Sequence, residues 1–146
     1  MAKRQPSRRP PNFLIYRGQS FRAEWYYTTD GEMPALDYYN NLPAVDQERL
    51  DDMIQYFCDR PFGVILPTSM YKIEDPENKI YAFRPRNERF FNFAAEGAVV
   101  VITNAYHKHS QQMTKMDLGK LALAAKYRED YLQRVKEATY YGHPEN

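Results

Sequence analysis

The chain is poor in cysteine, in glycine motifs and in charge of one sign, and each shortage excludes some functions. Its 146 residues include one cysteine, Cys58, which excludes an intramolecular disulfide framework and fits a reducing compartment. Twenty basic residues against nineteen acidic ones leave almost no net charge, so a nucleic-acid site must rest on local clusters. The six glycines form no phosphate-binding loop, nucleophile elbow or dinucleotide fingerprint.

Long apolar runs are also missing. None approaches the ~20 residues that cross a bilayer, and the basic N-terminus lacks the apolar core of a secretory signal. We therefore expect a cytoplasmic protein without membrane contact. The length fits one domain, which we assign to residues 13–138. Residues 139–146 are expected to form a frayed tail.

The first twelve residues are basic and rich in proline, with no apolar periodicity. They are expected to form a flexible arm that is either an untethered terminus or a phosphate-contacting tail. The basic residues are Lys3, Arg4, Arg8 and Arg9.

The apolar pattern of the following residues predicts an α+β domain. Strands are expected over 13–16 and 21–28, and helices over 34–40 and 44–59, the second with an apolar stripe at helical spacing. We expect residues 64–72 to be irregular and residues 74–78 to form a turn. A last helix begins near Thr114, where Asp117 completes a near capping box, and ends by residue 138.

Between the turn and the last helix, three strands are expected over 80–84, 89–94 and 99–106. The unbroken apolar run 98–102 indicates a central strand that is buried on both faces. Three arginines lie in and around the first turn of this meander, and Tyr and Phe residues lie between them. The arginines are Arg84, Arg86 and Arg89. A guanidinium offers a planar fork of donors that matches phosphate oxygens, although a lone arginine more often pairs with a surface carboxylate such as Glu88 or Glu96.

A polar cluster, His107-Lys108-His109, follows the last strand. Strand alternation predicts that the two histidines project to one side and Lys108 to the other. Two imidazoles without a third ligand do not complete a metal site, so we expect neither metal nor cofactor. The histidines are then either surface loop residues or proton-transfer groups. In the second case they would serve metal-free RNA cleavage, in which the 2′-OH attacks the adjacent phosphorus.

Several motifs of the meander and the last helix occur in an order typical of one family. Residues 80–84 (IYAFR) correspond to a Leu-Tyr-Glu-Leu-Arg strand, and residues 88–93 (ERFFNF) to a Tyr-Arg-aromatic strand. Residues 105–114 (AYHKHSQQMT) correspond to a glycine-aromatic-x-Lys-Lys-Thr-Gln-x-Thr-Pro segment. The last helix adds Ala124, Arg128, Asp130 and Tyr131. With these motifs in this order, the chain resembles the RelE/HigB toxin superfamily, and most of all its phage-derived HigB-like branch. The chain departs from the family pattern at Ala82, at Glu88 and in lacking proline after Met113.

The resemblance implies a small RelE-like α+β fold. Its sheet is mainly antiparallel, with the three-strand C-terminal meander plus an N-terminal strand, and is packed by two N-terminal helices and a C-terminal helix. It also implies the toxin of a type II toxin–antitoxin pair. Such a protein is an endoribonuclease (mRNA interferase) that cleaves mRNA on the ribosome and is neutralised by a helix-turn-helix antitoxin. The alternative is a non-catalytic protein on the same scaffold that binds RNA, DNA or a partner. The sequence assigns no oligomeric state.

The resemblance also ranks the residues of the expected site. Arg89 takes the position of the phosphate-stabilising arginine, and His109 falls where a second catalytic cation sits. The full expected catalytic set is Arg89, His109, Lys108, His107 and Arg84. The expected RNA-binding set is Arg84, Arg86, Tyr81, Tyr106 and Lys115. Which residue is base and which is acid stays open at this point.

Overall fold

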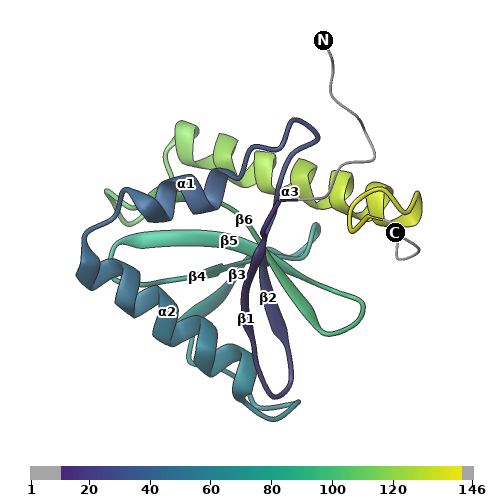
Figure 1. Ribbon diagram of the computed structural model, residues 1–146. Helices are drawn as coiled ribbons and strands as arrows, with labels where there is room; N and C mark the ends of the chain where they lie inside the picture. Colours follow the sequence, from purple (N-terminus) through teal and green to yellow (C-terminus); the bar gives the residue numbers. More distant parts are fainter. Residues whose placement is uncertain (1–10, 143–146) are drawn as a thin grey trace.

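The computed structural model describes residues 11–142, and these residues form one six-stranded sheet with helices on both of its faces (Figure 1). The elements follow in the order β1 (Leu14–Arg17), β2 (Arg22–Trp25), α1 (Pro34–Asn40), α2 (Ala44–Asp59), β3 (Tyr71–Asp75), β4 (Ile80–Phe83), β5 (Glu88–Ala95), β6 (Val99–His107) and α3 (Lys115–Lys136). The α+β class and the three helices are confirmed. Residues 1–10 of the predicted basic arm lie outside the described residues.

The predicted sheet was too small, and it lacked the one parallel pair that the structure contains. The strand order is β1-β2-β6-β5-β4-β3, and β2 runs parallel to β6, so the sheet is mixed. The predicted meander plus one N-terminal strand is only part of this six-stranded sheet. Sequence reasoning treated residues 71–75 as irregular chain and turn, yet they form the edge strand β3. Contacts across the sheet explain the difference, because Tyr71 pairs with Phe83 and stacks on Tyr81 with ring centroids 5.0 Å apart.

The first hydrophobic core fills the space between the sheet and the helices α1 and α2. Leu50, Ile54 and Phe57 of α2 are buried there, as the apolar stripe predicts. The sheet side of this core consists of Ala23, Trp25, Phe83, Phe90, Val100, Ile102 and Ala105. The free thiol of Cys58 is also buried in it, which agrees with a packing role.

The second core lies on the other face of the sheet, under α3 (Figure 1). Its sheet side consists of Tyr26, Ile80, Ala82, Phe91, Phe93, Val99, Val101 and Tyr106. Helix α3 begins with the predicted capping box, since the Thr114 hydroxyl accepts from the Asp117 N–H at 3.1 Å and the Asp117 carboxylate accepts from the Thr114 N–H at 3.0 Å. With a core on each face, the central strands β5 and β6 are buried on both sides, as the apolar run 98–102 predicts for β6.

The chain after α3 returns to this second core. Tyr140 is fully buried, and its hydroxyl accepts a hydrogen bond from the Tyr27 N–H at 3.1 Å. The Tyr141 hydroxyl donates to Glu24 at 2.7 Å. A frayed tail from residue 139 therefore does not describe these two residues, whose rings pack on the sheet.

Candidate functional site

Two arginines and a tyrosine lie side by side across β4, β5 and β6, where β5 begins and β6 ends. Phe83 of β4 pairs with Phe90 of β5, so the next residues outward, Arg84 and Arg89, face each other across the hairpin. Arg89 pairs in turn with Tyr106 of β6. Side chains that are opposite one another share a face, with Cβ atoms about 5 Å apart. We call Arg84, Arg89 and Tyr106 the arginine row.

Arg89 is held by backbone carbonyls. Its Nη1 donates to the oxygens of Arg86 and Glu88, both at 2.8 Å, and the residue is only 6% exposed. Burial lowers the pKa of the Arg89 guanidinium, and the nearby positive charge of Arg84 lowers it further. The two carbonyl dipoles therefore stabilise the positive charge of Arg89, whereas the positive charge of Arg84 repels it.

Arg84 is half-buried and also bonds to the backbone, since its Nη1 donates to the Thr68 oxygen at 2.6 Å. Its Nε is buried and has no hydrogen-bond partner among the described residues. Within residues 11–142, neither Arg84 nor Arg89 forms an ion pair with a carboxylate. Two facing guanidiniums without an ion-paired carboxylate are therefore a candidate site for an anion.

Tyr106 completes the row and lies on the α3 side of the sheet, where its ring is 5.4 Å from that of Phe91. Burial raises the pKa of the Tyr106 hydroxyl, and the carboxylates of Glu74 and Asp117 raise it further. Glu74 lies at the register shift of β3 and also favours the charged form of Arg89. Sequence reasoning missed Glu74, because its position depends on the strand β3 that was taken for a turn.

On the opposite face of the same strand ends, Glu88 of β5 pairs with His107 of β6. The His107 Nδ1 lies 2.8 Å from Glu88 Oε2, and the Tyr38 hydroxyl of α1 donates to Glu88 Oε1. Burial raises the pKa of Tyr38, and so does its hydrogen bond to this carboxylate. The ring of His109 meets that of His107 edge-on, with centroids 4.9 Å apart. We call Tyr38, Glu88 and His107 the Tyr38–Glu88–His107 chain.

The expected catalytic residues are thus divided between two faces. Arg84 and Arg89 lie on the α3 side, whereas His107 and His109 lie on the α1 side, because Glu88–His107 and Arg89–Tyr106 are successive pairs of one ladder. The structure does not bring Arg89 and His109 together on one face. Tyr38 and Glu88 were missed as site residues, since only the register of β5 against β6 reveals what Glu88 contacts.

The other expected residues take different positions around this end of the sheet. Arg86 lies in the β4–β5 turn with φ of 56°, and its Nη1 is 3.2 Å from the buried Asp46 Oδ1. Tyr81 is stacked on Tyr71 of the edge strand. Lys108 donates its backbone N–H to the Asn87 oxygen at 2.7 Å, and Lys115 is exposed at the start of α3.

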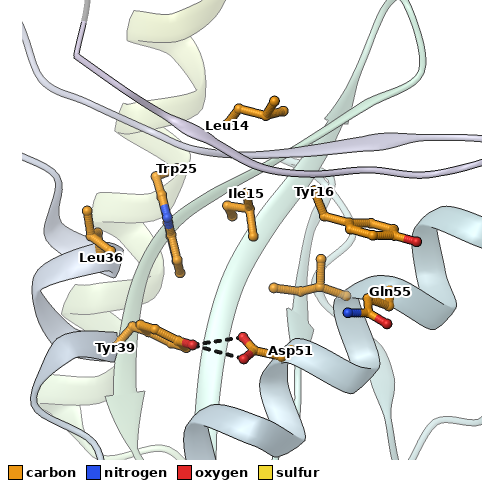
Figure 2. A pocket seen from close by; sticks show the side chains of 9 residues that line it. Leu14, Ile15, Tyr16, Trp25, Leu36, Tyr39, Asp51 and Gln55 are labelled. Carbon is orange, nitrogen blue, oxygen red and sulfur yellow. Dashed lines mark hydrogen bonds between the residues drawn. The ribbon is translucent and has the colours of Figure 1, made fainter.

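A separate pocket opens between β1, β2 and the helices α1 and α2, with a volume of about 350 Å³. Figure 2 shows Tyr39 of α1 and Asp51 of α2 facing each other across it, and the Tyr39 hydroxyl lies 2.9 and 3.0 Å from the two Asp51 carboxylate oxygens. Trp25 and Ile15 of the sheet also line it. No expected site residue lines this pocket.

No family model and no curated protein matches this chain. Among residues 11–142, no cluster of three or more His, Cys, Asp or Glu side chains is arranged to hold a metal ion. Across the same described residues, no helix is both long and apolar enough to span a membrane.

Proposed function

We propose that the protein is an endoribonuclease of the RelE/HigB type, the toxin of a toxin–antitoxin pair, which cleaves mRNA on the ribosome. The observation that carries the proposal is the arginine row. Like charges that face each other across a hairpin destabilise the sheet, and here they have no carboxylate partner among residues 11–142. Such a pair is useful to a protein that binds a phosphate there.

The chemistry of RNA cleavage matches these groups. When the 2′-OH attacks the adjacent phosphorus, negative charge builds on the phosphoryl oxygens, and preorganised cations stabilise that charge. Arg84 is the more accessible of the two arginines, and the buried Arg89 adds a second positive charge beside it. A base must take the 2′-OH proton and an acid must protonate the leaving 5′-oxygen, and imidazoles suit both transfers near neutral pH.

The proposed partners follow from this activity. The substrate is mRNA in the ribosome, so the protein acts in the cytoplasm, and no metal or cofactor takes part. A small helix-turn-helix antitoxin is expected to neutralise the toxin. An adjacent reading frame that encodes such a protein would support this part of the proposal.

The test is mRNA cleavage in a purified translation system, mapped by primer extension. The parent protein is expected to cut mRNA, whereas Arg84→Ala and Arg89→Lys lower the cleavage rate by about 100-fold or more, as loss of a charge-stabilising donor does. Arg49→Ala, which removes an exposed arginine of α2 far from the row in sequence, is the matched control and retains the parent rate.

Two outcomes contradict the proposal. Absence of cleavage with and without ribosomes, together with measurable RNA or DNA binding, identifies the alternative, a non-catalytic binding protein. Parent-like cleavage by folded Arg84→Ala and Arg89→Lys removes the arginine row from the mechanism. Circular dichroism of each variant checks that it is folded.

A further inference from the structure

The pocket between β1, β2, α1 and α2 has apolar and aromatic walls and a few polar groups. Its apolar and aromatic residues are Leu14, Ile15, Tyr16, Trp25, Leu36, Tyr39 and Ile54. Among the 9 described residues that line it, Asp51 carries the one formal charge, and Gln55 adds an amide. A volume of about 350 Å³ lies at the lower end of the range of small-molecule sites, which combine apolar walls with a few polar groups in the same way.

The Asp51 carboxylate can accept more hydrogen bonds than it receives from Tyr39. The residue is half-buried, and the Tyr39 hydroxyl lies 2.9 and 3.0 Å from its two oxygens. A hydroxyl has one hydrogen to donate, whereas an ionised carboxylate accepts about four hydrogen bonds. Burial and the hydrogen bond to Asp51 raise the pKa of Tyr39 to about 12, so this hydroxyl remains a neutral donor at neutral pH. Within residues 11–142, no cation forms an ion pair with Asp51.

Helix α2 adds further negative charge along this wall of the pocket. Asp51, Gln55 and Asp59 follow one another at intervals of four residues, so they lie on one face of the helix. The Asp59 carboxylate accepts a hydrogen bond from the Tyr16 hydroxyl at 2.6 Å, and in the described part of the chain it also has no ion-paired cation. Two carboxylates without paired cations give this side of the pocket a negative potential.

Trp25 provides an aromatic surface close to Asp51. Its side chain is only 6% exposed, and its ring centroid is 5.5 Å from that of Tyr39. In Figure 2, Trp25 and Leu36 lie at the Tyr39 end of the pocket, and Gln55 lies beside Asp51. The face of an indole ring attracts a cation, and a carboxylate accepts the hydrogens of an ammonium group. A ligand with a positive charge and an apolar body therefore complements this pocket better than a neutral or anionic one.

We propose that the pocket binds a small primary amine, whose ammonium group donates to Asp51 and whose apolar body packs against Trp25, Leu36 and Ile54. The proposal goes beyond RNA cleavage and does not depend on it. No residue of the arginine row lines the pocket, and the two sites have opposite charge. The row would attract anions, whereas the pocket would attract cations.

The first test uses the fluorescence of Trp25, which reports on the pocket directly because it is the single tryptophan of the chain. The full-length protein is titrated at neutral pH with 2-phenylethylamine, 2-phenylethanol and 3-phenylpropionate, which present an ammonium, a hydroxyl and a carboxylate on the same ring. The amine is expected to change the emission saturably and to bind at least about 10-fold more tightly than the alcohol, as a hydrogen bond to a charged group allows. The carboxylate is expected to give no saturable change. Isothermal titration calorimetry measures the same affinities independently.

The second test changes the charge of the pocket. Asp51→Asn is expected to weaken binding of 2-phenylethylamine by at least about 10-fold and to leave binding of 2-phenylethanol unchanged. Asp52→Asn is the matched control, because Asp52 is the exposed neighbour on α2 and does not line the pocket. Gln55→Glu adds a carboxylate at an exposed position of the pocket and is expected to tighten amine binding by about two- to five-fold.

Three results overturn the proposal. They are equal affinity for the amine and the alcohol, no saturable binding of the amine at millimolar concentration, and parent-like amine binding by folded Asp51→Asn. Circular dichroism checks the fold of each variant. If Asp51→Asn does not fold, Gln55→Glu decides the question, and amine binding that is unchanged or weaker in this variant overturns the proposal.

Discussion

Arg84 and Arg89 face each other across the β4–β5 hairpin, an arrangement that costs free energy unless an anion lies beside them. Arg89 lowers this cost by bonding to two carbonyl oxygens rather than to a carboxylate. Under the proposed function, a carboxylate partner would neutralise the pair and weaken phosphate binding there. At the scale of single residues, the facing charges of the row lower the stability of the fold, and the proposed phosphate binding gives a reason for them.

The Cys58 thiol is buried, and its position disfavours a role as a nucleophile. Burial raises the pKa of its thiol to about 12. At pH 8 only about one thiol in ten thousand is then ionised, so the native protein should resist alkylation by iodoacetamide. The unfolded chain ionises near the usual pKa of ~8.5, and the folded chain keeps its proton.

Two measurements check this prediction. Mass spectrometry after iodoacetamide treatment is expected to find modified Cys58 only in denaturant. The free energy of unfolding is expected to decrease as pH rises from about 9 towards 12, since the unfolded state binds fewer protons there. A Cys58→Ala variant should lose part of this dependence, and rapid alkylation of the native protein would contradict the assignment.

At the scale of elements, the β1–β2 turn is locked onto the end of α2. The N–H groups of Ser20 and Phe21 both donate to the Cys58 oxygen, at 2.7 and 3.0 Å. Gly18 permits this close approach, because an added Cβ would lie 2.6 Å from the Cys58 Cβ and 2.7 Å from its carbonyl carbon. These backbone atoms cannot move as freely as the end of a side chain.

We therefore predict that Gly18→Ala destabilises the protein by about 1–3 kcal/mol, the usual cost of overpacking. Gly119→Ala is the matched control. Gly119 lies in α3 with no atom within 4 Å of an added Cβ, so alanine there should stabilise the fold by about 0.5–1 kcal/mol. Urea unfolding measures both changes, and equal effects of the two substitutions would contradict this packing.

The same scale shows how far sequence reasoning reaches. The helices were predicted well because an apolar stripe, Pro34 at the start of α1 and the Thr114–Asp117 box are local signals. The parallel pairing of β2 with β6 was missed because the two strands are distant in sequence. The strand β3 pairs with the neighbouring β4, but its residues were divided between an irregular segment and a turn. The site divides in the same way. The motifs identified both Arg84 and Arg89, whereas the contacts of Glu88 needed the register of β5 on β6.

For the whole molecule, the second core is closed by residues that follow α3. Tyr140 is fully buried, the Tyr27 hydroxyl donates to its carbonyl oxygen, and Arg134 of α3 packs over its ring at 4.7 Å. Tyr141 adds a hydrogen bond to the buried Glu24 of β2. The chain end thus links α3 to the N-terminal half of the sheet.

We predict that truncation after Ala138 lowers the free energy of unfolding by at least about 3 kcal/mol, because it removes a buried aromatic ring and leaves polar groups without partners. Truncation after Gly142 is the control and should retain the stability of the full chain. Thermal and urea unfolding of the two proteins compare them directly. Equal stability would mean that Tyr140 and Tyr141 do not hold the core together.

The proposal that this molecule is a metal-independent RNase makes one chemical prediction that no binding protein shares. Attack by the 2′-OH leaves a 2′,3′-cyclic phosphate on one fragment and a 5′-hydroxyl on the other. The decisive measurement is mass spectrometry of mRNA fragments from a purified translation system that contains the parent protein and EDTA-treated protein stock. We predict cyclic-phosphate and 5′-hydroxyl ends whose yield depends on Arg84. Intact mRNA, or fragments with 5′-phosphate ends, would contradict the account.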